Sequence, residues 1–488
     1  MATIKRNLLY NFLLSVSQVL FPLLSIPYVA RVLDPEGVGR VAFIDSFSYY
    51  FVVMAELGIT VYGIREVVKL RDEPERLKRL VKELMGLRVI SSSLVMLLYA
   101  IMMWLLWDRI ADWRLLGFSV TFLLINFLAC DWYFMGMERF GFITIRSISV
   151  RILGLIALFV LVKNTDDFAT YYAVMVLSAV AIGIWNYGVM VREQGGGFLF
   201  TGLKAHLKKL WVIYLIGLLY SIPLMLDNVL LRLASVAAAV GFYTFPARLV
   251  RISSNLLTDS FLVFLPRVTY HDHRQEAVAV QERLLQNSRL VVLLSVPMGA
   301  GIYLLSDQLA AAYLGDKFLP VAANLRWLAV FPFLKGMALF LSNPVLMARH
   351  QEKSYLRNLA VSSTCYIPLA LLLSVYYADA GACMALVAAE LILLLLNLLS
   401  VRRLFPGLRI FDWRLFAEAL FLSALFILIV FGIKNIVHDA IPVLLTTIPV
   451  CIAVYFLLFI YVLKNPFAQQ LWAGINGLLK RRRHTNEA

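Results

Sequence analysis

The chain has 488 residues, of which 61% are hydrophobic and only 15% are charged, and its mean hydropathy is +0.81. A soluble protein carries about a quarter charged residues, so this composition excludes a soluble globular protein. The formal net charge is +15. In a membrane protein, excess Lys and Arg reflects topology and contact with anionic lipids, so this charge does not indicate binding of nucleic acid.

Apolar stretches of about 20 residues recur along the chain, and a helix of that length spans a bilayer. Lys and Arg are concentrated in alternate loops, which places both termini in the cytoplasm by the positive-inside rule. The first stretch is too long for the core of a signal peptide and is expected to remain as the first helix. We therefore predict an all-α polytopic membrane protein with about 14 transmembrane helices, at residues 8–30, 41–63, 86–107, 115–137, 143–162, 169–191, 211–233, 239–265, 288–306, 323–347, 357–377, 381–401, 415–434 and 441–463.

Residues 64–85, between the second and third spans, differ from the other loops. Leu77, Leu80 and Leu84 recur at helical spacing among arginines and lysines. This pattern predicts a basic amphipathic helix that lies on the inner leaflet of the membrane.

The stretch 239–265 is long enough to span a bilayer, yet it carries Arg248, Arg251, Asn255 and Asp259. At about 100° per residue, these four positions share one face of a helix. Charged side chains are costly in hydrocarbon and normally face a wet cavity or a partner. We therefore expect this face to line an aqueous lumen.

The first two spans resemble spans 7 and 8. An arginine ends the first helix of each pair (Arg31 or Arg232), and a glycine follows eight or nine residues later (Gly39 or Gly241). Related halves around a central site are typical of transporters.

Acidic side chains inside the predicted spans are candidates for coupling to H⁺ or Na⁺, because intramembrane carboxylates mark ion pathways in many transporters. The alternative is that they pair with the intramembrane cations. These acids are Asp45, Glu56, Asp227, Asp259 and Glu390.

The sequence contains no motif that indicates a metal or a cofactor. Its four cysteines lie in apolar stretches, and neither a CxxC motif nor a Cys/His cluster is present. It also has no GxxxxGK[ST] motif, so we do not expect hydrolysis of ATP by a P-loop. The predicted outer loops are too short for a catalytic domain, and we do not expect an enzyme.

Several features occur together in about the first 70 residues. They are an early asparagine, paired prolines in the first helix, the turn ARVLDPEGVG and the segment LGITVYGIR. With them the chain resembles the Wzx-type polysaccharide transporters, the O-antigen and capsule repeat-unit flippases of the multidrug/oligosaccharidyl-lipid/polysaccharide exporter (MOP) superfamily. Asp34 is a departure, since this family more often has Gly before the proline.

The resemblance implies two six-helix bundles in a V around a central cavity, which helices 1, 2, 7 and 8 would line. Helices 13 and 14 would be accessory. The corresponding segments are an amino-terminal bundle, a cytoplasmic linker, a second bundle, the accessory helices and a basic cytoplasmic tail, at residues 1–191, 192–210, 211–401, 402–463 and 464–488.

The resemblance also implies that undecaprenyl-diphosphate-linked oligosaccharide crosses the bacterial inner membrane, from the cytoplasmic to the periplasmic leaflet, by alternating access. A polysaccharide polymerase and a chain-length regulator are candidate partners, and H⁺ or Na⁺ is a candidate coupling ion.

Arginine suits a diphosphate because its planar guanidinium makes bidentate, charge-assisted hydrogen bonds. Arg248 and Arg251, one turn apart, are candidates to clamp the two phosphates, with Lys335 as a third cation. Arg31 is a candidate to receive the headgroup on the outer side. The alternative is that these cations pair with intramembrane acids such as Asp45, Asp227 or Asp259.

Two other kinds of function stay open. A peptidoglycan-precursor flippase or a cation-coupled multidrug exporter belongs to the same superfamily, although cationic drugs favour acids in the cavity. A membrane enzyme acting on lipid-linked sugars would usually need a large outer loop or a cytoplasmic domain, and the predicted topology provides neither.

Overall fold

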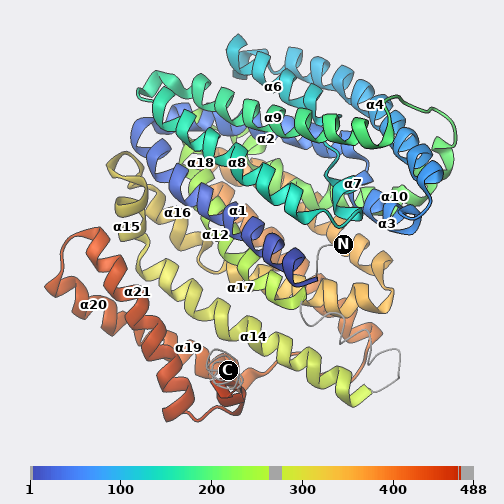
Figure 1. Cartoon of the computed structure of the whole chain (residues 1–488). Coiled ribbons are helices and arrows are strands. Elements are labelled where there is room, and N and C mark those ends of the chain that lie inside the picture. Colours follow the sequence, from blue (N-terminus) through green and yellow to red (C-terminus); the bar gives the residue numbers. More distant parts are fainter. Residues whose placement is uncertain (1–3, 111, 263–276, 471, 474–488) are drawn as a thin grey trace, which may run out of the picture. The chain divides into compact units, whose positions relative to one another are not determined.

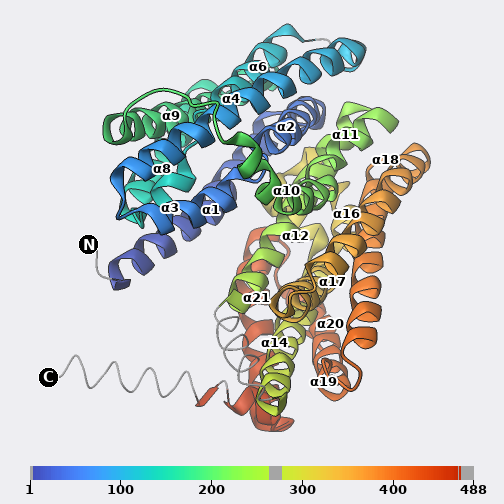
Figure 2. The ribbon, with the colours of Figure 1, turned by 90° about the vertical axis from the view of Figure 1, so that its right-hand side faces the viewer.

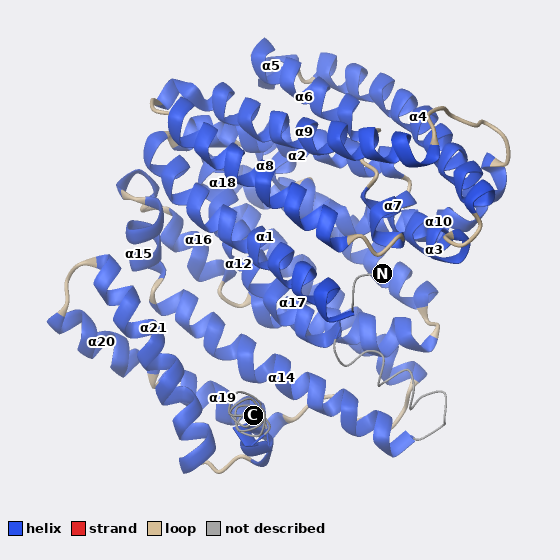
Figure 3. Cartoon of the chain, in the orientation of Figure 1, coloured by secondary structure: helices blue, strands red, loops and turns tan. Residues whose placement is uncertain are grey.

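The computed structural model describes residues 4–110, 112–262, 277–470 and 472–473 (Figure 1). Within these ranges every regular element is a helix (Figure 3). Ten helices are long and apolar enough to cross a membrane, or up to 11 if a bent pair is taken as one span. The prediction of an all-α membrane protein is confirmed, whereas the number of 14 transmembrane helices stays a prediction.

The chain divides into two compact units. Unit 1 contains the residues up to Phe245 together with Ser363–Ala382, and unit 2 contains Pro246–Ser362 and the residues from Cys383 onward. The first crossing between the units lies inside a helix at Pro246. A proline has no N–H, so the hydrogen-bond ladder of this helix is interrupted where the chain passes from one unit to the other.

Unit 1 is built from the helices of the amino-terminal half. Figure 2 shows α4, α6 and α9 of this unit side by side. Its elements are α1 (Ile4–Val32), α2 (Pro35–Glu56), α3 (Ile59–Leu70), α4 (Pro74–Leu105), α5 (Trp107–Ile110), α6 (Trp113–Asn126), α7 (Asp131–Gly136), α8 (Phe140–Leu161), η1 (Thr165–Asp167), α9 (Phe168–Gln194), α10 (Leu203–Met225), α11 (Asp227–Ala234) and the start of α12 (Ala237–Leu262).

Unit 2 contains the rest of α12 and most of the later helices. In this unit α14 packs against both α17 and α19. The later elements are α14 (Ala277–Leu304), α15 (Ser306–Leu309), η2 (Ala310–Leu314), η3 (Asp316–Phe318), α16 (Val321–Leu328), α17 (Phe331–Phe340), η4 (Leu341–Leu346), η5 (Met347–Arg349), α18 (Glu352–Leu404), α19 (Trp413–Ala424), α20 (Phe426–Ile436), α21 (Ala440–Leu457) and η6 (Leu458–Val462).

Local sequence explains the boundaries of α2. The Asp34 carboxylate accepts a hydrogen bond from the Gly37 backbone N–H at 2.7 Å, and Pro35 occupies the first position of the helix. Both features favour a helix start, so the departure at Asp34 supplies an N-cap. Leu57 and Gly58 are both left-handed, with φ of 51° and 74°. These two residues end α2 and divide the predicted span 41–63 into α2 and α3.

Other predicted spans also contain or adjoin breaks. Pro223 lies near the end of α10, and α11 begins at Asp227. The long helix α18 is in fact two helices, because Ala378 has a non-helical backbone with φ 47° and ψ −124°. This break separates the predicted spans 357–377 and 381–401.

The prediction of an amphipathic helix on the inner leaflet at 64–85 is wrong. These residues form the end of α3, a turn and the first turns of α4. Leu77, Leu80 and Leu84 are buried in an apolar cluster with Trp132 and Tyr133 of α7. An apolar helix face can be covered by protein as well as by lipid, and here unit 1 itself covers it.

Candidate functional site

A buried polar cluster lies at the break between α10 and α11 in unit 1. Asp227 is only 1% exposed. Its Oδ2 accepts a hydrogen bond from the Tyr243 hydroxyl at 2.8 Å, and its Oδ1 accepts one from the Asn228 backbone N–H at 2.7 Å. Broken helices are common at transporter binding sites, where polar groups are needed within the membrane.

The cluster connects α11 to α2 and to the start of α12. Asn228 Nδ2 donates to Ser46 Oγ at 2.8 Å, and Thr244 Oγ1 donates to Asn228 Oδ1 at 3.2 Å. Asp45, adjacent to Ser46, is half-buried. The structure thus brings α2, α11 and α12 together around predicted polar positions.

Two other predicted residues of unit 1 lie at helix ends. Glu56 is the last residue of α2 and is half-buried, whereas Arg31 is exposed in the last turn of α1.

In unit 2, Lys335 of α17 pairs with Glu390 of α18. Lys335 Nζ lies 2.6 Å from Glu390 Oε1, and the two side chains are 6% and 3% exposed. Lys335 therefore pairs with an acid, as the alternative to headgroup binding predicted. Its partner Glu390 is not one of the three acids named there, which were Asp45, Asp227 and Asp259.

A seam of amides extends from this pair along the same helices. Asn397 lies about two turns beyond Glu390 in α18, and its Nδ2 donates to the Ala338 carbonyl at 3.3 Å. Asn358 Nδ2 in turn lies 3.1 Å from Asn397 Oδ1 and 2.8 Å from Ser400 Oγ. These contacts satisfy polar side chains that would otherwise be costly to bury.

Arg248 and Arg251 are half-buried and lie one turn apart in the part of α12 that belongs to unit 2. Asn255 and Asp259 lie in the same helix, but their side chains are outside the described part of the structure. The shared face of the four residues therefore remains a prediction.

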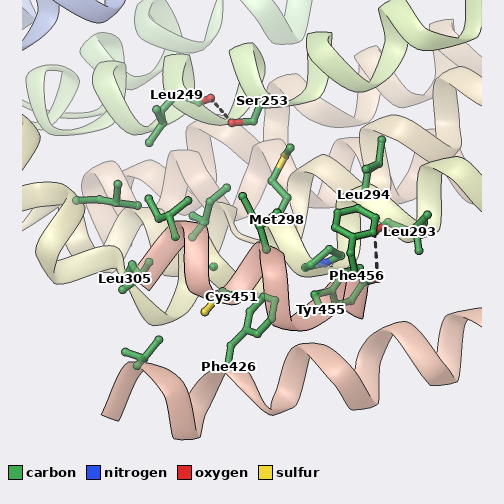
Figure 4. Close-up of a pocket in the computed structure, with 17 residues that line it drawn as sticks. Leu249, Ser253, Leu293, Leu294, Met298, Leu305, Phe426, Cys451, Tyr455 and Phe456 are labelled. Carbon is green, nitrogen blue, oxygen red and sulfur yellow. Dashed lines mark hydrogen bonds between the residues drawn. The ribbon is translucent and has the colours of Figure 1, made fainter. Parts of the chain in front are cut away.

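The same part of α12 contributes Leu249 and Ser253 to a cavity of about 470 Å³ (Figure 4). The hydroxyl groups in the wall are already bonded to backbone, since Ser253 Oγ donates to the Leu249 carbonyl and Tyr455 OH to the Leu293 carbonyl, both at 3.0 Å. The cavity therefore presents apolar walls that suit hydrocarbon. Its described lining is Leu249, Ser253, Leu293, Leu294, Pro297, Met298, Gly301, Ile302, Leu305, Leu309, Phe426, Val430, Ile448, Cys451, Ile452, Tyr455 and Phe456.

Two buried arginines of unit 1 were missed at the sequence level. Arg146, which is 2% exposed, pairs with Asp131 at 3.0 Å and hydrogen-bonds to Asn186. Arg88 donates to the Ala129 carbonyl at 2.5 Å, at the break between α6 and α7. Both arginines fall inside apolar stretches of the sequence, and this position was the feature that could have identified them. Their partners are distant in sequence and leave no local pattern.

The described residues contain no group of three or more His, Cys, Asp or Glu side chains placed to hold a metal ion. None of the four cysteines, all of which lie in the described ranges, forms a disulfide; three are buried, and Cys365 is partly exposed.

Solved structures with a similar fold include a flippase and a multidrug transporter. The chain superposes on a lipid II flippase, MurJ, in an inward closed conformation, with a TM-score of 0.75, 15% identity and coverage of 94% of this chain and 100% of that chain. A multidrug resistance MATE family transporter of the MOP superfamily, in an inward-facing conformation, gives a TM-score of 0.60 at 15% identity, with coverage of 80% and 95%. The chain therefore shares its fold with these two membrane proteins.

The family follows from the sequence itself. The profile of the family described as "Polysaccharide biosynthesis protein" matches residues 4–270, more than half of the chain, and the chain belongs to this family. A "Putative O-antigen transporter" of Shigella dysenteriae is 20% identical over 401 residues, covering 82% of this chain and 100% of the relative. A protein of the same description from Escherichia coli (strain K12) is 21% identical over 411 residues, covering 82% and 97%. The predicted resemblance is confirmed.

Proposed function

We propose that the protein moves undecaprenyl-diphosphate-linked oligosaccharide repeat units from the cytoplasmic to the periplasmic leaflet of the bacterial inner membrane by alternating access. The observation that carries the proposal is the composition of α12 in unit 2. This helix bears the half-buried Arg248 and Arg251, and its Leu249 and Ser253 line an apolar cavity. A ligand that binds both the two arginines and the apolar cavity would combine a dense negative charge with a hydrocarbon chain.

The two arginines suit the diphosphate part of such a ligand. Residues three apart on a helix are neighbours, so Arg248 and Arg251 can contact adjacent phosphates. Guanidinium–phosphate pairs are bidentate and stronger than neutral hydrogen bonds. In the outward state, Arg31 at the end of α1 is the proposed receiver of the headgroup.

The cavity suits part of the isoprenoid chain. Its volume of about 470 Å³ is in the range of sites for small molecules, so it accommodates one segment of a long polyprenyl tail. Burial of hydrocarbon contributes about 25 cal/mol per Å² of apolar surface, which favours retention of the tail while the headgroup crosses.

The buried pair in unit 2 offers a route for ion coupling. While Glu390 is ionised, its carboxylate holds the Lys335 ammonium at 2.6 Å. In this pair, Glu390 is the candidate to exchange H⁺ or Na⁺, and Lys335 is the candidate to contact the anionic headgroup. Asp45, Glu56 and Asp227 of unit 1, with Asn255 and Asp259 of α12, are further candidates for polar contacts or for H⁺ or Na⁺.

The proposed architecture has 14 transmembrane helices with both termini in the cytoplasm. Helices 1–6 and 7–12 form two bundles in a V around a central cavity, and helices 13 and 14 are accessory. The similarity of fold to MOP-superfamily transporters supports this arrangement. Transfer of the repeat unit to a polysaccharide polymerase and a chain-length regulator would follow on the periplasmic side.

The test is complementation of a bacterium that lacks its own repeat-unit flippase, scored by surface polysaccharide at matched protein levels. We expect the wild type to restore the polysaccharide of the pathway native to its source and Arg248→Gln or Arg251→Gln to reduce it at least tenfold. Arg414→Gln is the matched control, because Arg414 is highly exposed and pairs only with the nearby Glu418 among the described residues.

Failure of the well-expressed wild type with its native pathway would contradict the proposal. The same strains separate the alternatives. Rescue of a strain depleted of its peptidoglycan-precursor flippase would favour that function, and resistance to cationic drugs without surface polysaccharide would favour a drug exporter.

A further inference from the structure

A second groove lies in unit 1, distant in sequence from the α12 cavity. It has a volume of about 510 Å³ and lies between α4, α6 and the connection from α9 to α10. Its described lining is apolar apart from two serines and consists of Val89, Ser92, Ser93, Met96, Leu97, Leu123, Leu124, Phe127 and Phe198.

Two lysines precede the groove on the same face of α4. At about 100° per residue, Lys78 and Lys82 fall within about 60° of Val89, Ser93 and Met96 around the helix. Lys82 is about 10 Å from Val89 along the axis, at 1.5 Å per residue. Both lysines lie before the apolar part of α4, which the predicted span places from residue 86 onward, so we expect them near the membrane surface.

The connection between α9 and α10 closes this end of the groove. The Leu199 backbone N–H donates to the Lys82 carbonyl at 2.9 Å, and Phe198 lines the groove. Lys78 runs beside Gly195, because its Cε lies 3.4 Å from the position that a Cβ on this glycine would occupy. The two lysines and the apolar groove are thus parts of one continuous surface.

The lysines differ from the other basic residues around them. Arg76 pairs with Glu73 at 2.7 Å, and Arg79 pairs with Glu83 at 2.9 Å. In the described ranges of the chain, Lys78 and Lys82 form no such salt bridge and are half-exposed. Their charges are therefore available to an anion at the membrane surface.

We propose that this groove binds an anionic phospholipid, with the phosphate at Lys78 and Lys82 and an acyl chain along Val89–Leu97. Charge complementarity at one end and apolar walls at membrane depth favour this occupant over a zwitterionic lipid. The bound lipid would hold the connection from α9 to α10 against α4.

The test uses the purified full-length protein in nanodiscs that contain a phosphatidylglycerol with a photoreactive diazirine in its acyl chain. Mass spectrometry of the labelled peptides should place the label on residues 89–97, 123–127 and 198. A lysine near the membrane surface contributes about 1 kcal/mol to binding of anionic lipid, equivalent to about a fivefold change in affinity. We expect Lys78→Gln/Lys82→Gln to raise the half-saturating fraction of the probe about 30-fold.

Two further variants separate the charge from the groove. Arg76→Gln removes a paired charge from another face of the same helix and should change labelling less than twofold. Ser93→Trp fills the groove while it keeps both lysines and should abolish the label at 89–97. Each variant is compared at equal thermal stability and monodispersity.

Three results would overturn the proposal. Equal labelling of the groove by a phosphatidylcholine probe would identify an ordinary boundary lipid. Labelling that is unaffected by the lysine substitutions would exclude recognition of the headgroup. Displacement of the probe by undecaprenyl phosphate, at a concentration where phosphatidylglycerol does not compete, would assign the groove to the transported lipid.

Discussion

Gly39 of α2 and Gly241 of α12 make reciprocal contacts with each other's helix. A Cβ on Gly39 would lie 1.8 Å from the Ala237 carbonyl oxygen, and Ala237 precedes Gly241 by four residues. A Cβ on Gly241 would lie 2.0 Å from the Pro35 carbonyl oxygen, and Pro35 precedes Gly39 by four residues. This reciprocity is the pattern of a two-fold-related interface, so the glycines of the sequence repeat also form a pair in space.

Gly39→Ala and Gly241→Ala should each destabilise the protein. The added methyl group must displace backbone atoms, and overpacking of this kind typically costs about 1–3 kcal/mol. We expect a lower midpoint of thermal unfolding in detergent and a loss of transport in the complementation assay. Gly217→Ala in α10 is the control, because nothing lies within 4 Å of its Cβ position. An unchanged midpoint for both Gly39→Ala and Gly241→Ala would mean that the helices do not pack so closely in the membrane.

The pair Lys335–Glu390 can be tested by a double-mutant cycle. Lys335→Met or Glu390→Gln alone leaves one buried group without its charged partner, and such changes typically cost about 3–5 kcal/mol. The double variant should recover most of the lost stability, because no unpaired charge remains. Thermal unfolding of the four proteins measures the coupling.

Transport by the double variant then distinguishes two roles of this pair. Recovery of stability without recovery of transport is expected if Glu390 exchanges a proton or Lys335 meets the headgroup. Full recovery of both would assign the pair to structure alone and would remove it from the proposed mechanism.

Tyr243→Phe removes the hydroxyl that donates to the buried Asp227 carboxylate at 2.8 Å. A hydrogen bond to a charged group contributes about 1.5–3 kcal/mol, so we expect a lower unfolding midpoint. Tyr376→Phe should leave the midpoint unchanged, because Tyr376 is 77% exposed. Equal midpoints for the two variants would show that the Tyr243 hydroxyl does not stabilise the break between α10 and α11.

His206 in the first turn of α10 connects this helix to α3 and α4. Its Nδ1 lies 2.8 Å from the Tyr62 hydroxyl, and its Nε2 lies 3.1 Å from Glu83 Oε2. His206→Ala removes the partner of the Tyr62 hydroxyl and one partner of Glu83, which keeps its pairing with Arg79, and should cost about 1–3 kcal/mol. His206→Gln, which keeps one donor and one acceptor, should restore part of the loss. The measurement is thermal unfolding, and a midpoint insensitive to His206→Ala would contradict the bridging role.

The class of the fold could be predicted because membrane insertion depends on local composition. A stretch of about 20 apolar residues is sufficient to indicate a span wherever it occurs in the chain. The breaks inside the spans were harder to predict from the sequence. The end of α2 requires a left-handed Leu57, a conformation that a leucine side chain does not reveal.

The partners of the intramembrane charges could not be predicted for a different reason. Lys335 and Glu390 are 55 residues apart, and Arg146 and Asp131 meet across two helices. Such pairs depend on the packing of whole helices. The environment of the apolar face of residues 64–85 could not be predicted either. Its periodicity predicts that the face is buried but does not specify whether lipid or protein buries it.

The composition of unit 1 affects any attempt to divide the gene. Ser363 Oγ in the α18 segment donates to the Leu219 carbonyl of α10 at 3.0 Å, so residues far along the chain complete the amino-terminal unit. A polypeptide that stops at Phe245 would lack Ser363–Ala382 and would leave the surface of α10 uncovered. Split expression should therefore fail for the first fragment alone and should succeed only when the second fragment is synthesised in the same cell.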